Sequence, residues 1–208
     1  MTTTVFTTLP VYVTILVALI TAILGPIIVN WVKHKMEKKS QNTLMFDALE
    51  TSTLVDTQLE IVLEELECDR VWIAQFHNGG HFYPTGKSIQ KFSIFYEKVT
   101  LGTVPIQHTF QNVPVSLFPK GLAELYEKGE LAVPNHQSED YGLLPQMIAF
   151  GSSSFYMIGL EDLHDRFIGA LAISFNEEYK LTKEDWIFIR QKAGVIGTLL
   201  DEYLNAKK

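Results

Sequence analysis

The residues whose types and spacing could support chemistry gather first around Asn78-Gly79-Gly80, which follows an apolar run and is flanked by His77 and His81. A zinc site needs three or four ligands, and these histidines supply two. If residues 70–77 form a strand and the glycines turn the chain, His81 need not point where His77 does. The pattern therefore favours a structural turn over a metal site.

A further interpretation of this stretch is that the loop forms one rim of a ligand pocket. Binding pockets are largely apolar and carry a few convergent polar groups. The stretch offers both kinds of side chain. The candidate lining residues are His77, Asn78, Phe82 and Tyr83.

Other reactive side chains do not assemble into catalytic machinery. Ser152, Ser153 and Ser154 follow a glycine but lack the Gly-x-Ser-x-Gly pattern of a nucleophile elbow. Asp162 and His164 lie in an expected hairpin turn, where such residues are common for conformational reasons. We therefore expect no catalytic residue, no bound metal, no cofactor and no enzymatic activity.

Composition limits the fold and the partners. The chain has 208 residues, 47% of them hydrophobic, and a net charge of −7. This is material for one globular core and little more. An acidic protein lacks the basic surface that neutralises phosphates, so we expect no nucleic-acid partner. The single cysteine, Cys68, rules out an internal disulfide and is expected to be a small buried residue.

The N-terminal part predicts a membrane anchor. After a short tail, residues 1–8, no charged residue occurs from Leu9 to Val32, which is long enough to cross a bilayer as a helix. Four lysines follow within a linker of residues 33–42, whereas the tail has none. The positive-inside rule places this basic flank in the cytoplasm. We therefore expect a single span of the inner membrane and a cytoplasmic domain over residues 43–205.

The elements of that domain alternate between helices and strands. An amphipathic helix is predicted over residues 43–69, and a helix capped by Thr182 is predicted to close the chain. Strands are predicted at 70–77 and 91–100, an irregular edge segment at 101–116, and a clear hairpin in "SSSFYMIGLED" and "RFIGALAISFN". Shorter elements are expected between them: a helix over 122–128 ended by Gly129, a strand in "LAVP", and a helix around Pro145.

The stretch "SSSFYMIGLEDLHDRFIGALAISFNEEYKLTKEDWIFIRQKAGVIGTLL" resembles the closing third of a GAF domain, and "GLAELYEKGELAVPNHQSED" is similar to the middle of that family. Related PAS-like domains share the general plan. The resemblance implies an α+β fold with helices on one face of a central antiparallel sheet and a pocket for a ligand or partner on the other. The motif of cyclic-nucleotide-binding members is absent, and no cysteine stands mid-domain where phytochrome-like members attach a bilin.

Two functional classes follow from these patterns. The first is a membrane-anchored GAF-like module that senses a small molecule or binds a protein partner as a homodimer. The second is a phage lysis protein, because T-even phage holins share this layout of one membrane helix and a soluble domain. The dimer is predicted from a seam of apolar residues spaced four and three apart. Its members are Ala48, Ser52, Val55, Leu59, Val62 and Leu66.

Overall fold

The structure is a computed structural model that describes residues 26–27, 30–31, 33, 35, 45–81, 84–135 and 149–205. The chain divides into two units, Met1–Ala48 with Lys208, and Leu49–Lys207. Among the described residues, no helix has the length and apolar character that a membrane crossing requires. The predicted span from Leu9 to Val32 lies almost wholly outside those residues and stays a prediction, as does the predicted helix around Pro145.

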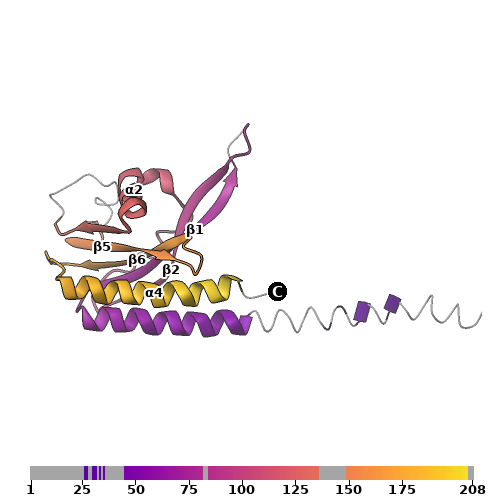
Figure 1. The fold of residues 1–208 in the computed structure, drawn as a ribbon, viewed down its shortest axis with the longest axis horizontal. Helices are drawn as coiled ribbons and strands as arrows, with labels where there is room; N and C mark the ends of the chain where they lie inside the picture. The colour runs from indigo at the N-terminus through magenta and orange to yellow at the C-terminus, as the bar shows by residue number, and fades with distance from the viewer. Residues whose placement is uncertain are drawn as a thin grey trace, which may run out of the picture. The chain divides into compact units, whose positions relative to one another are not determined.

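A six-stranded antiparallel sheet organises the second unit, in the order β3-β2-β1-β6-β5-β4 (Figure 1). The predicted β5–β6 hairpin is confirmed, and so is an irregular segment that ends at the sheet edge as β3. The strands are β1 (Arg70–His81), β2 (Ser88–Val99), β3 (Val113–Pro114), β4 (Glu130–Val133), β5 (Ser154–Glu161) and β6 (Phe167–Phe175).

Two long helices cover one face of this sheet (Figure 1). The first helix spans residues 45–65, and α4 spans Lys183–Asn205. They lie side by side, and Lys192 Nζ of α4 donates a hydrogen bond to Gln58 Oε1 of the first helix at 3.0 Å. Their inward side chains and those of β1, β5 and β6 form one apolar cluster, which we call the helix-face core. Its members include Val55, Leu59, Val62, Leu66, Ile73, Leu171, Ile189 and Ile196.

The predicted coiled-coil seam is therefore wrong as a contact between two chains. Val55, Leu59 and Val62 have no exposed surface, and they pack on the sheet of their own domain. A helix that packs on a sheet repeats its apolar residues three and four apart, as a coiled-coil helix does, so the spacing alone cannot separate the two cases.

The opposite face is covered by short and irregular elements. Residues 100–112, a 3-10 helix over Val115–Leu117, and α2 (Pro119–Lys128) lie there. Gly129 ends α2 in the left-handed conformation, at φ 74°, as predicted. The apolar residues between this cover and the sheet form a second cluster, the cavity-face core. Its members include Trp72, Ile94, Ile106, Phe110, Phe118, Leu125, Phe155 and Met157.

The β1–β2 hairpin extends beyond the rest of the sheet (Figure 1). β1 pairs with β6 only as far as Gln75, whereas it pairs with β2 out to His81. The prediction that Asn78-Gly79-Gly80 turns the chain is wrong, because these residues continue β1 through a register shift. A bulge accounts for the difference: Gly80 adopts a φ of 90°, which a strand accommodates when one residue is left unpaired.

Candidate ligand-binding site

The candidate site is a cavity between the sheet and its irregular cover. Alternate residues of a strand point to the same face, so β1 contributes Trp72, Ala74 and Phe76 to one wall. Neighbouring strands complete the sheet wall, and the cover contributes Ile106, Phe110 and Leu122. The other lining residues are Phe92, Ile94, Phe155, Met157 and Ala170.

Size and polarity define what the cavity can hold. Every lining side chain is apolar. The cavity has a volume of about 20 Å³, which is room for about one water molecule. An apolar wall offers that water no partner, so the space is suited to an apolar group. A larger ligand requires the rings to move apart.

A row of aromatic rings leads outward from the cavity at the base of the β1–β2 hairpin. Phe76 lines the cavity and packs against Phe167 of β6, with ring centroids 5.2 Å apart. Phe167 in turn contacts Tyr126 of α2 edge to face, at 5.5 Å. These rings come from three elements. They close this end of the site, and no short sequence motif brings them together.

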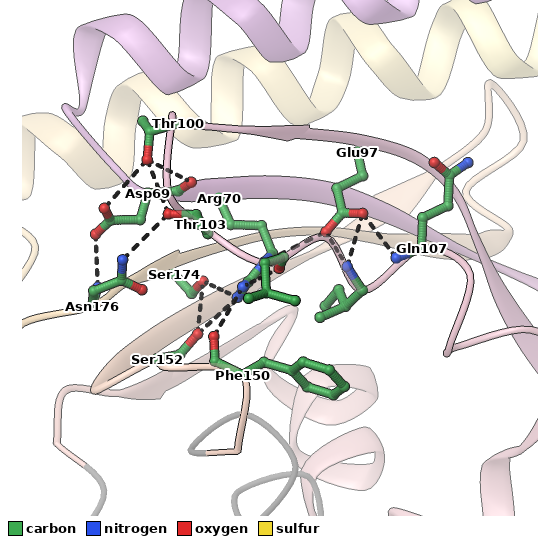
Figure 2. Close-up of polar contacts among 12 residues, drawn as sticks. Asp69, Arg70, Glu97, Thr100, Thr103, Gln107, Phe150, Ser152, Ser174 and Asn176 are labelled. Atoms are coloured by element: carbon green, nitrogen blue, oxygen red, sulfur yellow. Dashed lines mark hydrogen bonds and ion pairs between the residues drawn. The ribbon is translucent and has the colours of Figure 1, made fainter.

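A buried arginine holds the cover of the cavity to the sheet (Figure 2). Arg70 has no exposed surface, and it lies on the face of β1 that carries Trp72. Its Nη1 donates to Ser152 Oγ at 2.9 Å and to Ser174 Oγ at 3.1 Å. Its Nη2 donates to the carbonyl oxygens of Val104 at 2.6 Å and Phe150 at 3.1 Å. One side chain therefore joins two loops to β6.

Glu97 extends this network to the cavity wall. Its Oε1 lies 3.4 Å from Arg70 Nε, as an ion pair without hydrogen-bond geometry. Its carboxylate accepts the backbone N–H groups of Ile106, at 2.9 Å, and Gln107, at 2.8 Å. Desolvation lowers the pKa of Arg70, and the charge of Glu97 opposes that effect. The backbone of Ile106 is thus fixed by a buried charge pair.

A second polar cluster closes the same end of the sheet (Figure 2). Asp69 Oδ2 accepts the backbone N–H of Asn176 at 2.7 Å. Thr100 and Thr103 share a hydrogen bond of 3.0 Å between their hydroxyls, and the backbone N–H of Thr100 donates to the Asp69 carbonyl at 2.9 Å. These contacts anchor the start of the segment that covers the cavity.

Of the residues predicted to line a pocket rim, His77 and Asn78 are not among those that line the cavity. His77 Nε2 lies 2.9 Å from Ser93 Oγ, and the His77 ring contacts Phe95 with centroids 6.3 Å apart. Asn78 Oδ1 accepts a hydrogen bond from Gln90 Nε2 at 2.9 Å, farther out along the hairpin. Phe82 and Tyr83 lie outside the described residues. The rim role of these four residues stays a prediction.

Among the described residues, the grouping that could hold a metal ion is Asp162, His164 and Asp201, not His77 and His81. Asp162 Oδ1 accepts the backbone N–H groups of His164, at 2.8 Å, and Arg166, at 2.9 Å. Its Oδ2 accepts a hydrogen bond from Arg166 Nε at 2.5 Å. Desolvation acts to raise the pKa of Asp162, but these hydrogen bonds and the Arg166 charge outweigh it and lower the pKa. The carboxylate thus stabilises the β5–β6 turn.

The single cysteine lies away from the cavity. Cys68 is fully buried in the helix-face core, as predicted. Burial raises the pKa of its thiol to about 12. A thiol with so high a pKa is unreactive near neutral pH, because the thiolate is the nucleophile.

Comparison with known proteins finds matches only at the level of structure. No protein-family pattern matches this chain. No curated protein matches it in sequence.

Solved structures of GAF domains and of a related photoreceptor share the fold of this chain. The blue-light-absorbing form of the Thermosynechococcus elongatus PixJ GAF domain has a TM-score of 0.61 at 16% identity, over 75% of this chain and 88% of that one. A far-red cyanobacteriochrome photoreceptor has a TM-score of 0.61 at 12% identity, over 83% of this chain and 97% of that one. The phycocyanobilin-bound GAF domain of a cyanobacterial phytochrome has a TM-score of 0.56 at 12% identity, over 78% of this chain and 94% of that one. With its six-stranded antiparallel sheet between a helical layer and a cavity, the domain has a GAF-like α+β fold.

Proposed function

We propose that this chain is a membrane-anchored, non-enzymatic sensory module whose GAF-like domain binds a small apolar molecule. The observation that carries the proposal is the fully apolar cavity between the sheet and a cover that a buried charge pair and a limited set of hydrogen bonds join to the sheet. Such a cover can shift as a unit when a ligand enters. Displacement of Ile106 and Phe110 would then be the signal.

The chemistry of the cavity selects among the ligands of similar folds. One of the similar GAF domains is described as phycocyanobilin-bound. In this chain Cys68, the only cysteine, lies in the helix-face core and cannot attach a bilin in the cavity. The lining also has no cation to pair with the phosphate of a cyclic nucleotide. We therefore assign the cavity to an uncharged, apolar ligand.

The lining residues also support a binding role over a catalytic one. None of them is a nucleophile, an acid or a base. The buried polar groups nearby are engaged in fixing the backbone, as Glu97 is with Ile106 and Gln107. Measured turnover of any substrate, abolished by a substitution in the cavity, would contradict this assignment.

The cavity can be tested with the full-length protein through Trp72, which lines it. In a Trp31→Phe, Trp186→Phe background, Trp72 is the remaining tryptophan. We expect bromobenzene to quench its fluorescence saturably, because heavy atoms quench on contact. The anionic analogue 4-bromobenzoate should not do so.

The matched variants for this test are Ala170→Leu, which fills the cavity, and Ala123→Leu, which adds the same atoms to the exposed surface of α2. Ala170→Leu should weaken binding by about tenfold or more. Ala123→Leu should leave it unchanged. Linear, unsaturable quenching that is equal in all variants would reject the cavity as a binding site.

The membrane anchor is proposed from the sequence. The uncharged stretch from Leu9 to Val32 and the lysines that follow support one inner-membrane span with a cytoplasmic domain. Protease protection in spheroplasts tests the topology, because a cytoplasmic domain is cut only after the membrane is opened. Cutting of intact spheroplasts would instead favour the alternative of a phage-type holin, whose soluble domain lies in the periplasm.

Homodimerisation is proposed through the outward surfaces of the two long helices, not through the buried seam. Leu54 of the first helix is 45% exposed, and Ile187 of α4 is 65% exposed. Parallel anchoring raises the local concentration of two such surfaces. We expect Leu54→Cys to form a disulfide between two chains in membranes, and Val55→Cys, whose side chain is buried, to form none. Equal cross-linking by both would argue against this surface.

A further inference from the structure

The outer part of the β1–β2 hairpin, residues 76–81 and 84–92, is a two-stranded arm with little support from the rest of the sheet. On its β1 side, pairing with β6 stops at Gln75, and on its β2 side, β3 reaches only Lys91 and Phe92. An isolated two-stranded hairpin is marginally stable in water. Its free strand edges also invite pairing. A second surface that holds the arm would resolve both difficulties.

Charge sets the arm apart from the rest of this acidic protein. From Arg70 to Tyr96 the chain contains no aspartate or glutamate, although the whole chain has a net charge of −7. Toward the tip, the exposed ionisable side chains are those of His81 at the end of β1 and Lys87 just before β2. Lys91 lies within β2. The arm is therefore suited to an anionic surface.

The glycine bulge leaves room for the side chain of Lys91. Lys91 is opposite His77 in the register, yet its side chain runs alongside Gly79. A Cβ at position 79 would lie 2.9 Å from Lys91 Nζ and would overlap the carbon chain. The φ of Gly79 is not in the left-handed region, so a side chain here would cause no backbone strain but would displace the flexible end of Lys91. The missing side chain lets Lys91 extend from the level of residue 77 toward the tip.

The arm points to the end of the domain at which the chain enters it. The first helix leads through residues 66–69 directly into β1, which therefore returns toward the start of that helix. Along the direction of the helix, the tip of the arm is level with the N-terminal part of the helix and not with its C-terminal end (Figure 1). A membrane anchor that precedes Leu49 is joined through the chain to this end of the helix.

We infer that the arm is a second membrane contact, which binds anionic lipid headgroups through Lys87 and Lys91. The inference rests on the membrane anchoring proposed above. Each lysine near an anionic bilayer contributes enough to change a binding equilibrium by roughly fivefold. Two lysines would hold an otherwise marginal arm against the membrane and so restrict the orientation of the domain on its anchor.

An alternative anionic partner is a second copy of the chain. A groove of about 580 Å³ is lined by Glu65, Glu67, Asp69, Glu177 and Glu178, among others. It lies at the beginning of β1, whereas the tip of the arm is at the other end of that strand. The groove and the tip therefore lie at opposite ends of the strand, and two parallel copies side by side would not bring the arm of one to the groove of the other. The geometry favours lipid.

The test uses the full-length protein in vesicles, with a fluorophore on Thr85→Cys near the tip or on Glu177→Cys at the groove. Cys68 is buried and does not compete for the label. Lipids that carry a nitroxide on the headgroup quench a fluorophore at the membrane surface. We expect quenching at position 85, and not at position 177, in vesicles that contain phosphatidylglycerol. Pure phosphatidylcholine or high salt should abolish it.

The matched variants are Lys87→Gln with Lys91→Gln, against Lys120→Gln with Lys183→Gln on other exposed surfaces. The arm variant should lower the contact equilibrium about 30-fold, and the control should not change it. Chain that floats with the vesicles but shows no charge-dependent quenching at position 85 overturns the arm contact alone. Chain that does not float overturns the anchor and this inference together. A cross-link from position 85 of one copy to position 177 of another assigns the arm to the groove instead.

Discussion

The side chains on the two faces of the sheet are buried to a similar degree, but different kinds of structure cover them. The helix face is covered by two long helices whose aliphatic residues recur with helical spacing, and Val55, Leu59, Ile189 and Ile196 are all within 2% of complete burial. The cavity face is covered by a short helix and an irregular segment, and Arg70 and Glu97 bind the backbone of the irregular segment. The first face is held by packing, and the second is held by packing together with a buried polar network.

This difference separates a constant scaffold from an adjustable site. A packed helix layer resists change, because any shift opens space or creates overlap. A cover fixed by a few directional bonds has discrete alternatives, since those bonds can be exchanged for others. The cavity lies on the adjustable face. The outcomes below would strengthen or remove the distinction.

The largest effect is expected for Arg70→Ala, which leaves Glu97 and several acceptors buried without their partner. Breaking a buried ion pair costs about 3–5 kcal/mol of unfolding free energy. Urea unfolding of the domain, monitored by circular dichroism, measures it. Arg70→Lys keeps the charge but loses the planar fork, and it should recover only part of the loss. A cost below about 1 kcal/mol for Arg70→Ala would show that the cover does not depend on this network.

A truncation on each face tests the packing itself. Leu59→Ala on the helix face should cost about 3 kcal/mol, because the fully buried site leaves a cavity that the two helices cannot close. Met157→Ala borders the existing cavity, so fewer contacts are lost, and we expect about 2 kcal/mol. The difference between the two unfolding free energies is the quantity to measure. A larger cost for Met157→Ala would reverse the proposed roles of the faces.

Two glycines of α4 give a matched pair. A Cβ at Gly197 would overlap the carbonyl oxygen of Glu161 in β5, whereas a Cβ at Gly194 meets no atom within 4 Å. Gly194→Ala should therefore stabilise the domain by up to about 1 kcal/mol, because alanine favours the helix. The overlap should make Gly197→Ala destabilising by about 1–3 kcal/mol despite the same propensity gain. Thermal unfolding of both variants decides the matter, and equal shifts would mean that α4 does not approach β5 so closely.

The smallest expected effect concerns the pH dependence of the β5–β6 turn. The pKa of Asp162 is lowered in the folded state, so its contribution to stability is complete above its unfolded pKa of about 3.9 and is lost as the pH falls through the folded value. Asp162→Asn should thus be less stable than the wild type at pH 7, and the gap should narrow in acid. Asp165→Asn in the same turn is the control. A gap that does not change with pH would exclude the carboxylate as its source.

Local patterns predicted the regular elements well. Thr182 caps α4 as expected, since Asp185 N donates to Thr182 Oγ1 at 3.2 Å and Thr182 N donates to Asp185 Oδ2 at 2.7 Å. These signals act over a few residues. The bulge at Gly79 and Gly80 cannot be distinguished from a turn by local pattern, because the same glycines serve either conformation.

The site was harder to predict from the sequence, because its parts are distant in the chain. Arg70 stands at the start of a strand, and nothing near it indicates that Ser152 and Ser174 will be its partners. The cavity wall likewise combines Phe76 with Ile106 and Met157. The resemblance to GAF domains implied a pocket on this face, but the identity of its walls required the tertiary structure.

The register shift in the middle of the β1–β2 pair determines which face of the sheet the side chains of β2 point to beyond the shift. Ile73 is opposite Tyr96 and Ala74 is opposite Ile94, so no residue of β1 lies opposite Phe95. The Phe95 residue is 48% exposed. In a regular ladder of the same sequence, Glu97 would be opposite Val71 and its carboxylate would enter the helix-face core. The extra residue places it opposite Trp72, on the same face as Arg70. Deletion of Phe95, unlike most deletions inside a strand, would therefore keep the charge pair intact, whereas one more inserted residue would reverse the side on which Glu97 lies.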